Sequence, residues 1–187
     1  ACEASGLKTG LFTSPHISCF RERIRINGQM ISEAQVRKYL NLLFSLCEEH
    51  GITATFFELT TMMAFAHFAA EKVDVAVLET GLGGRLDATN ISRSILSIIT
   101  SISHDHTEIL GESIDAITKE KAGIIKASIP VIIGPTVTKS LIEPIANQHG
   151  SQCIQVTGSF EDYHEENCAT ARRALEWLSV SEEHIEE

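Results

Sequence analysis

The chain has 187 residues, of which 43% are hydrophobic, and its 25 acidic side chains outnumber its 15 lysines and arginines. This length allows about one domain with a sizeable core, and the net charge of −10 argues against nucleic acid and anionic membranes as partners. Five widely spaced cysteines without a CxxC pair predict neither a disulfide framework nor a zinc site, so we expect a cytoplasmic protein.

Short β-rich runs alternate with longer segments of helical period, which is the pattern of parallel βαβ units. The predicted strands cover residues 9–13, 73–78, 95–101, 131–133 and 153–156, and the predicted helices cover residues 32–50, 60–72, 113–126, 138–149 and 167–178. Ser32 and Gln35 form a capping box at the first helix. Residues 15–31 read as a loop and a short extended stretch that closes on an Asn-Gly turn. We therefore predict a doubly wound α/β fold with a mainly parallel sheet flanked by helices.

Polar side chains follow three of the predicted strands, at the ends where open parallel sheets bind ligands. Ser14 follows the first strand, Glu79 the second and His106 the third. If these loops converge, their oxygen and imidazole ligands can hold one metal ion, and Mg²⁺ prefers oxygen donors. Each residue alone has a more ordinary explanation: Ser14 as a turn residue, Glu79 as a cap and His106 as a hydrogen-bonded structural histidine.

Glycines follow Glu79 in the sequence GLGG, where they permit a close approach of the backbone to a ligand. GLGG differs from the GxGxxG fingerprint and does not open a helix, so a Rossmann dinucleotide site is not expected.

Lys121 lies on the apolar face of its predicted helix. Isoleucines occupy four positions at helical spacing from it: 114, 117, 124 and 125. Burial disfavours an ammonium group, so we expect this lysine to be paired, neutralised or chemically altered. The alternative is a lysine that extends to the edge of the helix. Lys119 and Lys126 lack this placement and are predicted to face solvent.

Seven segments in succession carry a family resemblance: TSPHI, FRERIRING, FFELTTMMAFAHF, VDVAVLETGLGGRLDATNI, TSISHDHTEILG, ITKEKAGIIK and HEEN. Together they resemble folylpolyglutamate and dihydrofolate synthases, which are ATP-dependent ligases of the Mur-ligase type, over roughly residues 6–178. The resemblance implies that residues 1–178 form the central ATPase domain of such a ligase. Residues 179–187 would then begin an acidic connection to a C-terminal domain.

The resemblance implies a catalytic metal centre. Ser14, Glu79 and His106 are expected to hold magnesium, and Lys121 is expected to carry a carbamate that supports a second ion. Glu79, His106 and Lys121 would then be the catalytic side chains. A carbamate would convert the awkward buried cation into an anion that donates oxygen.

The resemblance also implies two binding regions. Gly83, Gly84 and Asn167 are expected at the ATP site, with Asn167 against adenine, although Glu165 stands where relatives usually have glutamine. The folate contacts are expected to be His16, Phe20 and Arg23. As an alternative, the arginines around position 23 merely line an edge that faces solvent.

The implied reaction is amide formation. ATP phosphorylates a carboxylate of dihydropteroate or of a folate glutamate, and the amine of L-glutamate attacks the acyl phosphate. Such chemistry depends on positioning and on cations that neutralise developing charge. The expected partners are therefore ATP with two Mg²⁺ ions, the folate or dihydropteroate, and L-glutamate, all bound by a monomer.

The sequence departs from this family at its phosphate-binding loop. No GxxxxGK[ST] motif occurs in the 187 residues, and the connection from Pro135 to His164 is shorter than in typical relatives. We interpret the chain as a fragment or a truncated gene product that does not turn over ATP by itself. Two alternatives stay open: a non-catalytic remnant that binds folate or a partner chain, and a metal-dependent hydrolase suggested by the HxH of His104 and His106.

Overall fold

The computed structural model describes residues 1–186, and contacts within the chain divide it into two compact units, Ala1–Gly81 and Leu82–Glu187. The five cysteines are free thiols. No helix in the described part of the chain is long and apolar enough to cross a lipid bilayer. The predicted boundary between a domain and a connection at residue 178 stays a prediction.

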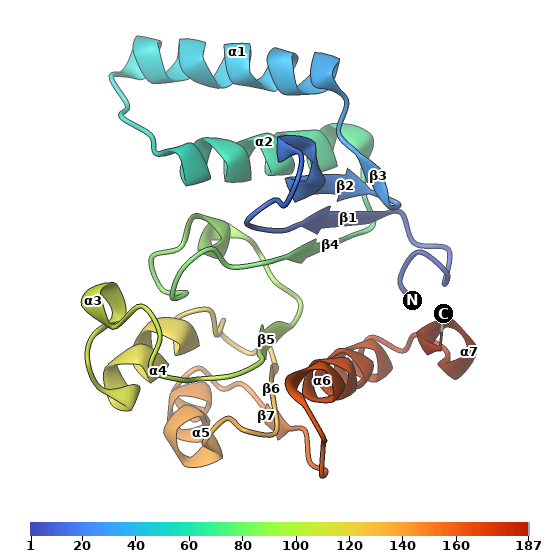
Figure 1. Cartoon of the computed structure of the whole chain (residues 1–187), viewed down its shortest axis with the longest axis vertical. Coiled ribbons are helices and arrows are strands. Elements are labelled where there is room, and N and C mark those ends of the chain that lie inside the picture. The colour runs from blue at the N-terminus through green and yellow to red at the C-terminus, as the bar shows by residue number, and fades with distance from the viewer. Residues whose placement is uncertain (187) are drawn as a thin grey trace. The chain divides into compact units, whose positions relative to one another are not determined.

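The first unit contains a four-stranded mixed sheet and two long helices (Figure 1). In spatial order its strands are β3 (Gln29–Met30), β2 (Ile24–Ile26), β1 (Thr9–Phe12) and β4 (Val75–Leu78). β1 and β4 are parallel, with Thr9 opposite Val75 and Phe12 opposite Leu78. β2 and β3 form an antiparallel hairpin, and a 3-10 helix, η1 (Phe20–Arg23), precedes it.

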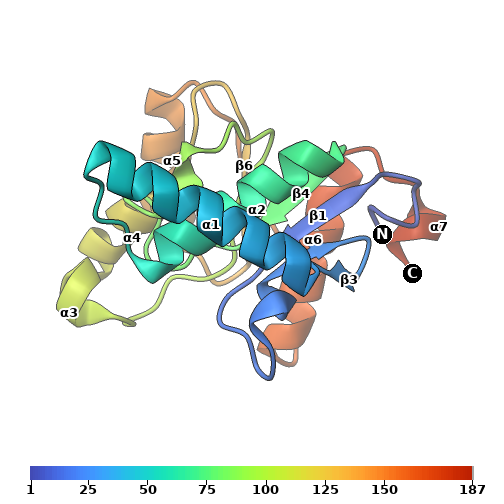
Figure 2. The same ribbon diagram turned by 90° about the horizontal axis from the view of Figure 1, so that it is seen from above.

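Helix α2 (Phe56–Glu71) is apolar on most of its sides because it lies between α1 (Glu33–His50) and the sheet, as Figures 1 and 2 show. Its buried Met63 and Phe68 share a core with Phe12 of β1. Both helices begin at capping boxes, the predicted Ser32–Gln35 pair and an equivalent Thr55–Glu58 pair.

The second unit contains a three-stranded parallel sheet made of β5 (Ser97–Ile99), β6 (Val131–Ile133) and β7 (Cys153–Gln155). Its helices are α3 (Thr107–Leu110), α4 (Ile114–Ala122), α5 (Lys139–Gln148), α6 (Tyr163–Trp177), α7 (Glu182–Ile185) and the 3-10 helix η2 (Ala88–Ile91).

Successive side chains of β6 point to opposite faces of the sheet, and this alternation explains why helices of the second unit pack on both faces. Val131 and Ile133 join the core formed with α4 and α5, whereas Ile132 packs with Ala174 of α6. Helices therefore cover both faces of this parallel sheet, which confirms the predicted doubly wound α/β class. The strands form two hydrogen-bonded sheets rather than one continuous sheet.

Three helix boundaries differ from the prediction by four residues, and two of them have a local cause in a capping residue. α2 begins four residues early because Thr55 caps it, and α6 begins four residues early because the Asp162 carboxylate accepts hydrogen bonds from the amides of His164 and Glu165. α4 ends at Ala122 rather than at residue 126.

Candidate functional site

The parallel pairing of β1 with β4 brings two of the predicted site residues together. The backbone amide of Ser14 donates a 2.6 Å hydrogen bond to Oε2 of Glu79, and the amide of Glu79 donates to the carbonyl of Phe12. The carboxyl ends of parallel strands meet at one edge, so residues 65 positions apart in sequence become neighbours there. The described residues provide no further hydrogen bond for the Glu79 carboxylate or for the Ser14 hydroxyl.

The loop that follows Ser14 is closed by a single carboxylate. Glu22 accepts hydrogen bonds from the backbone amides of Ile17, Ser18 and Cys19 at 2.9, 3.2 and 2.8 Å. These bonds stabilise the ionised form and lower the pKa of Glu22, with the bond from Ile17 as the largest cause. The loop therefore has a defined conformation at neutral pH.

The three predicted folate contacts form one cluster with a fourth residue, Phe56. Nε of Arg23 donates to Nδ1 of His16 at 2.8 Å, and the Arg23 guanidinium lies 5.4 Å from the centre of the Phe56 ring. The Phe20 ring lies 6.2 Å from the ring of His16 and 5.9 Å from that of Phe56. Arg23 is only 8% exposed, so the alternative of a solvent-facing edge is wrong for this arginine.

Phe56 is not among the contacts predicted from the sequence. Its signal was present, because Phe56 is the first residue of the FFELTT segment and directly follows the capping residue Thr55. Its 60% exposure leaves an aromatic face available to a ligand.

Two glycines of the GLGG segment, Gly83 and Gly84, fit against α3 and the end of α4. A Cβ at Gly84 would lie 2.8 Å from the carbonyl oxygen of Glu120 and 2.9 Å from that of Lys121, and a Cβ at Gly83 would lie 2.8 Å from Leu110. The amide of Arg85 donates to the Glu120 carbonyl, and its guanidinium pairs with the Glu120 carboxylate at 3.0 Å. These glycines thus have a packing role. Their contact with ATP stays a prediction.

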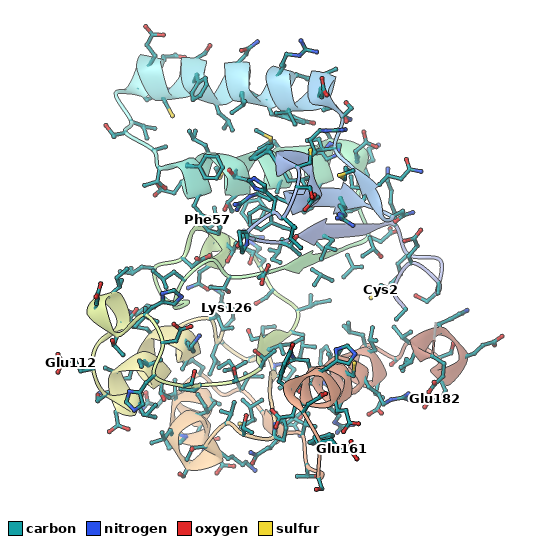
Figure 3. All side chains as sticks on the ribbon, in the orientation of Figure 1. Cys2, Phe57, Glu112, Lys126, Glu161 and Glu182 are labelled. Carbon is teal, nitrogen blue, oxygen red and sulfur yellow. The ribbon has the colours of Figure 1, made fainter. Side chains whose placement is uncertain are left out.

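Asn90 and Lys126 hold the same segment in place. Nδ2 of Asn90 donates to the carbonyls of Arg85 and Gly123, both at 3.0 Å. Nζ of Lys126, which Figure 3 labels, donates to the backbone oxygen and to Oδ1 of Asn90 at 2.5 and 2.7 Å. The prediction that Lys126 faces solvent is wrong, because its side chain is half-buried and its ammonium group donates two hydrogen bonds to Asn90.

Lys121 is half-buried rather than fully buried. The helix ends one residue after it, so Ile124 and Ile125 lie beyond α4 and only Ile114 and Ile117 share its helical face. Within the described residues the Lys121 ammonium has neither a hydrogen bond nor an ion pair. Lys119 is exposed, as predicted.

His106 precedes α3 and is largely exposed, with 58% of its side chain accessible. Its backbone is left-handed (φ 51°), and its amide and imidazole both contact the carboxylate of Asp105. Among the residues that the structure describes, no group of three or more His, Cys, Asp or Glu side chains has the geometry of a metal site. In the described residues, the metal-dependent hydrolase suggested by His104 and His106 therefore lacks a third ligand of these types.

Asn167 lies in the second turn of α6 and is exposed, as is His164. Glu165, which replaces the usual glutamine, accepts a hydrogen bond from the amide of Glu161. Of the four predicted metal ligands, Ser14 and Glu79 belong to the first unit, and His106 and Lys121 belong to the second. The four-residue metal site stays a prediction.

No protein-family model matches the chain. A dihydrofolate synthase/folylpolyglutamate synthase of Haemophilus influenzae is 39% identical to it over 176 residues. That alignment covers 92% of this chain and 35% of the relative. The chain belongs to the folylpolyglutamate synthase/dihydrofolate synthase family. It spans about a third of the length of this curated family member.

Two solved structures extend this family relationship to the fold. A folylpolyglutamate synthase in complex with AMPPCP and folate is 30% identical, with a TM-score of 0.87 over 98% of this chain and 55% of that one. A bifunctional family member of Yersinia pestis, complexed with AMPPNP and a manganese ion, is 39% identical. Its TM-score is 0.76 over 82% of this chain and 37% of that one.

Proposed function

We propose that this chain forms part of a ligase that uses ATP to join L-glutamate to a carboxylate of folate or dihydropteroate. The acid is first phosphorylated, and the glutamate amine then displaces phosphate from the acyl phosphate. The observation that carries the proposal is the contact between Ser14 and Glu79 at the carboxyl edge of β1 and β4, in a chain of this family. A similar protein binds AMPPCP, an ATP analogue, together with folate.

The cluster of His16, Phe20, Arg23 and Phe56 is the proposed folate contact. Two aromatic rings and a guanidinium suit a ligand that combines flat rings with carboxylates. Phe56 is exposed enough to stack on such a ring, and Arg23 is already oriented by His16. An oriented arginine loses less entropy when it pairs with a carboxylate.

A divalent cation fits the donor atoms at the edge of β1 and β4. In the described residues, one carboxylate oxygen of Glu79 has no hydrogen-bond partner, and the Ser14 hydroxyl has none either. These are the hard oxygen donors that Mg²⁺ and Mn²⁺ prefer. The family resemblance assigns His106 and Lys121 to the same centre, with two ions in total. The bound cations would neutralise negative charge on the phosphoryl group.

Lys121 is the proposed site of carbamylation. Its side-chain amine is half-buried and has no carboxylate partner in the described residues. Addition of carbon dioxide to that amine forms a carbamate and releases a proton. The product is an oxygen donor where the unmodified lysine offers none.

The cysteines and the net charge of the chain support a proposed compartment and a proposed set of partners. Free cysteines and an acidic chain favour the cytoplasm, and we propose a monomer whose partners are ATP, folate or dihydropteroate, and L-glutamate. Nucleic acid is not a proposed partner, because a net charge of −10 repels a phosphate backbone. Gly83, Gly84 and Asn167 are the proposed ATP contacts.

A rival function is folate binding without catalysis, which the absence of GxxxxGK[ST] from the 187 residues favours. We propose that these residues by themselves bind folate but do not turn over ATP. The test is calorimetric titration of the chain with folic acid, followed by an ADP-release assay with Mg²⁺, ATP, folate and L-glutamate.

We expect folate binding that weakens about tenfold in Arg23→Gln, since one charge-assisted contact is lost. Arg25→Gln is the matched control, because Arg25 donates to the Glu22 carbonyl outside the aromatic cluster. Equal loss in both variants would remove the folate assignment. ADP release that requires folate and glutamate would show instead that the chain is catalytically complete.

A further inference from the structure

A buried hydroxyl in α4 of the second unit has no hydrogen-bond partner. The Thr118 side chain is 1% exposed, yet its Oγ1 makes no hydrogen bond with any of the described residues. Such a hydroxyl has given up its bonds to water without replacing them, which destabilises the folded chain. Folded proteins rarely leave a buried polar group unpaired. Thr118 therefore indicates a partner that the unmodified side chains around it do not supply.

Three buried threonines in other helices show what is unusual about Thr118. Each of them donates its hydroxyl to the backbone carbonyl four residues earlier, at 2.7 to 2.9 Å: Thr60 and Thr61 of α2 and Thr170 of α6. For Thr118 the equivalent carbonyl is that of Ile114, the first residue of α4, and the hydroxyl does not bond to it. The hydroxyl can therefore donate to a group that lies beside the helix.

Lys121 lies one turn after Thr118 on the same side of α4. Residues three apart in a helix are neighbours on its surface, and around the helix axis Lys121 falls between Ile117 and Thr118, which are both fully buried. Long helical side chains run back toward the helix N-terminus, which directs the stem of Lys121 over the turn of these two residues. In the described residues the Lys121 ammonium has no hydrogen bond or ion pair. Two polar groups without partners thus share one face of a helix.

Carbamylation of Lys121 would give the Thr118 hydroxyl an acceptor. The neutral amine attacks carbon dioxide, a bond forms between Nζ and the carbon, and a proton leaves the nitrogen for solvent. The product carries two oxygens and a negative charge. An unmodified ammonium can only donate hydrogen bonds, so it leaves the hydroxyl proton without an acceptor, whereas a carbamate oxygen accepts it.

We propose that Thr118 is a positioning residue for the carbamate of Lys121. Its hydroxyl donates to one carbamate oxygen and leaves the other oxygen available to a cation. A hydrogen bond from a buried donor to an anion is stronger than a bond between neutral groups, and it fixes the orientation of the anion. The inference rests on the carbamylation of Lys121 in the proposed function. It adds the residue that stabilises the carbamate before any metal ion binds.

The test measures carbamate formation by ¹³C NMR of the whole 187-residue chain in metal-free buffer, titrated with ¹³C-bicarbonate at constant pH. We expect a carbamate signal that is absent from Lys121→Arg. Thr118→Val replaces the hydroxyl with a methyl group of similar size. It should raise the bicarbonate concentration for half-occupancy about tenfold, because one hydrogen bond to an anion is lost. Thr118→Ser keeps a hydroxyl and should restore most of the occupancy.

Thr170→Val is the matched control, because it removes a hydroxyl that already has a partner. Thr170 is 2% exposed in α6 and donates to the carbonyl of Glu166. Without bicarbonate, Thr170→Val should lower the midpoint of urea unfolding, since a hydrogen bond is lost. Thr118→Val should leave that midpoint unchanged or raise it, since an unpaired buried hydroxyl is removed. The carbamate occupancy of Lys121 should be the same in Thr170→Val as in the native chain.

The results distinguish failure of this inference from failure of the proposed function. If the native chain and Thr118→Val form the carbamate at the same bicarbonate concentration, the role of Thr118 is wrong and the carbamylation stands. The role is also wrong if Thr118→Ser behaves like Thr118→Val, or if Thr118→Val lowers the urea midpoint as much as Thr170→Val does. If no carbamate forms on Lys121 in the native chain, the inference falls together with the proposed carbamylation, and the proposed folate contact is unaffected.

Discussion

The two units hold their candidate site residues by different means. In the first unit, strand pairing and hydrogen bonds at strand ends place Ser14 and Glu79, and one carboxylate, Glu22, closes the neighbouring loop. In the second unit, Gly83 and Gly84 are placed by close packing on α3 and the end of α4, and the Asn90–Lys126 pair holds the residues that follow them. Hydrogen bonds at an open edge tolerate small shifts, whereas a glycine against backbone carbonyls does not.

The largest expected effect is on the free energy of unfolding, and it is measured by replacing one glycine in each unit with alanine. At Gly84 a Cβ meets two carbonyl oxygens of α4, which cannot move without unwinding the helix end, so Gly84→Ala should lower the free energy of unfolding by about 3 kcal/mol. At Gly81 a Cβ meets the tip of the Phe57 ring at 2.4 Å, and because a side chain shifts more easily than a helix backbone, Gly81→Ala should cost less, about 1 kcal/mol. Urea unfolding measures both, and a greater loss at Gly81 would reverse the comparison.

Asn90→Ala should produce the next largest effect, about 2 kcal/mol, because two carbonyls lose a donor and the half-buried Lys126 ammonium loses Oδ1. The loss should appear as faster amide exchange in residues 82–91, measured by hydrogen–deuterium exchange. Asn27→Gly is the control in the first unit, since among the described residues Oδ1 of Asn27 accepts a single exposed hydrogen bond, from the Thr9 amide, and glycine keeps its left-handed backbone (φ 46°). Unchanged exchange in residues 82–91 would show that Asn90 does not hold the segment.

Arg23→Met should cost about 1 kcal/mol, since the methionine keeps the apolar contact with Phe56 but loses the bond to His16. We expect the aromatic rings of Phe20 and Phe56 to shift in NMR spectra, while the signals of β5, β6 and β7 stay in place. Shifts spread over both units would contradict a local role for Arg23.

The smallest expected effect is a pH dependence confined to the first unit. His67 is 4% exposed between Tyr39 and Phe68, its Nδ1 has no hydrogen-bond partner among the described residues, and desolvation by burial lowers its pKa below the ordinary 6.5. As pH falls below about 6.5, the unfolded chain binds a proton that the folded chain resists, so the unit loses stability until the pH passes the lowered pKa.

Hydrogen exchange at pH 7.5 and 5.5 checks the His67 prediction. Protection of α2 should fall at the lower pH in the native chain, and the fall should be smaller in His67→Met. Every other histidine in the described residues is half-buried or exposed, so protection of α5 serves as the internal reference. An equal fall in both helices would assign the pH dependence to another group.

The sequence predicted the fold class well because alternation and capping are local signals. Ser32 caps α1 as its pattern indicated, and β6 has the predicted bounds. The Thr55–Glu58 capping box was not predicted, because α2 itself carries apolar residues on most of its sides. The helical spacing of apolar and polar residues that would mark its first turn is therefore weak. The division into two sheets depends on strand pairings between distant segments, which local patterns do not specify.

The candidate site was only partly predictable for a similar reason. The contact between Ser14 and Glu79 follows from a general rule about parallel strands. Phe56 and the burial of Arg23 depend on how η1 packs against α2, and the half-burial of Lys121 depends on where α4 ends. Gly123 follows the end of α4, and its lack of a side chain lets Arg85 pack against it, since a Cβ at Gly123 would lie 2.3 Å from the Cβ of Arg85.

The register of β1 against β4 also has a consequence for the order of folding. Thr9 pairs with Val75, so this ladder closes a loop that contains both α1 and α2. In the second unit, Ser97 pairs with Val131 and Val131 with Cys153, which close much shorter loops. Because closing a longer loop costs more chain entropy, the β5–β6–β7 sheet should form faster after dilution from denaturant. The edge that holds Ser14 and Glu79 would then be among the last parts of the chain to assemble.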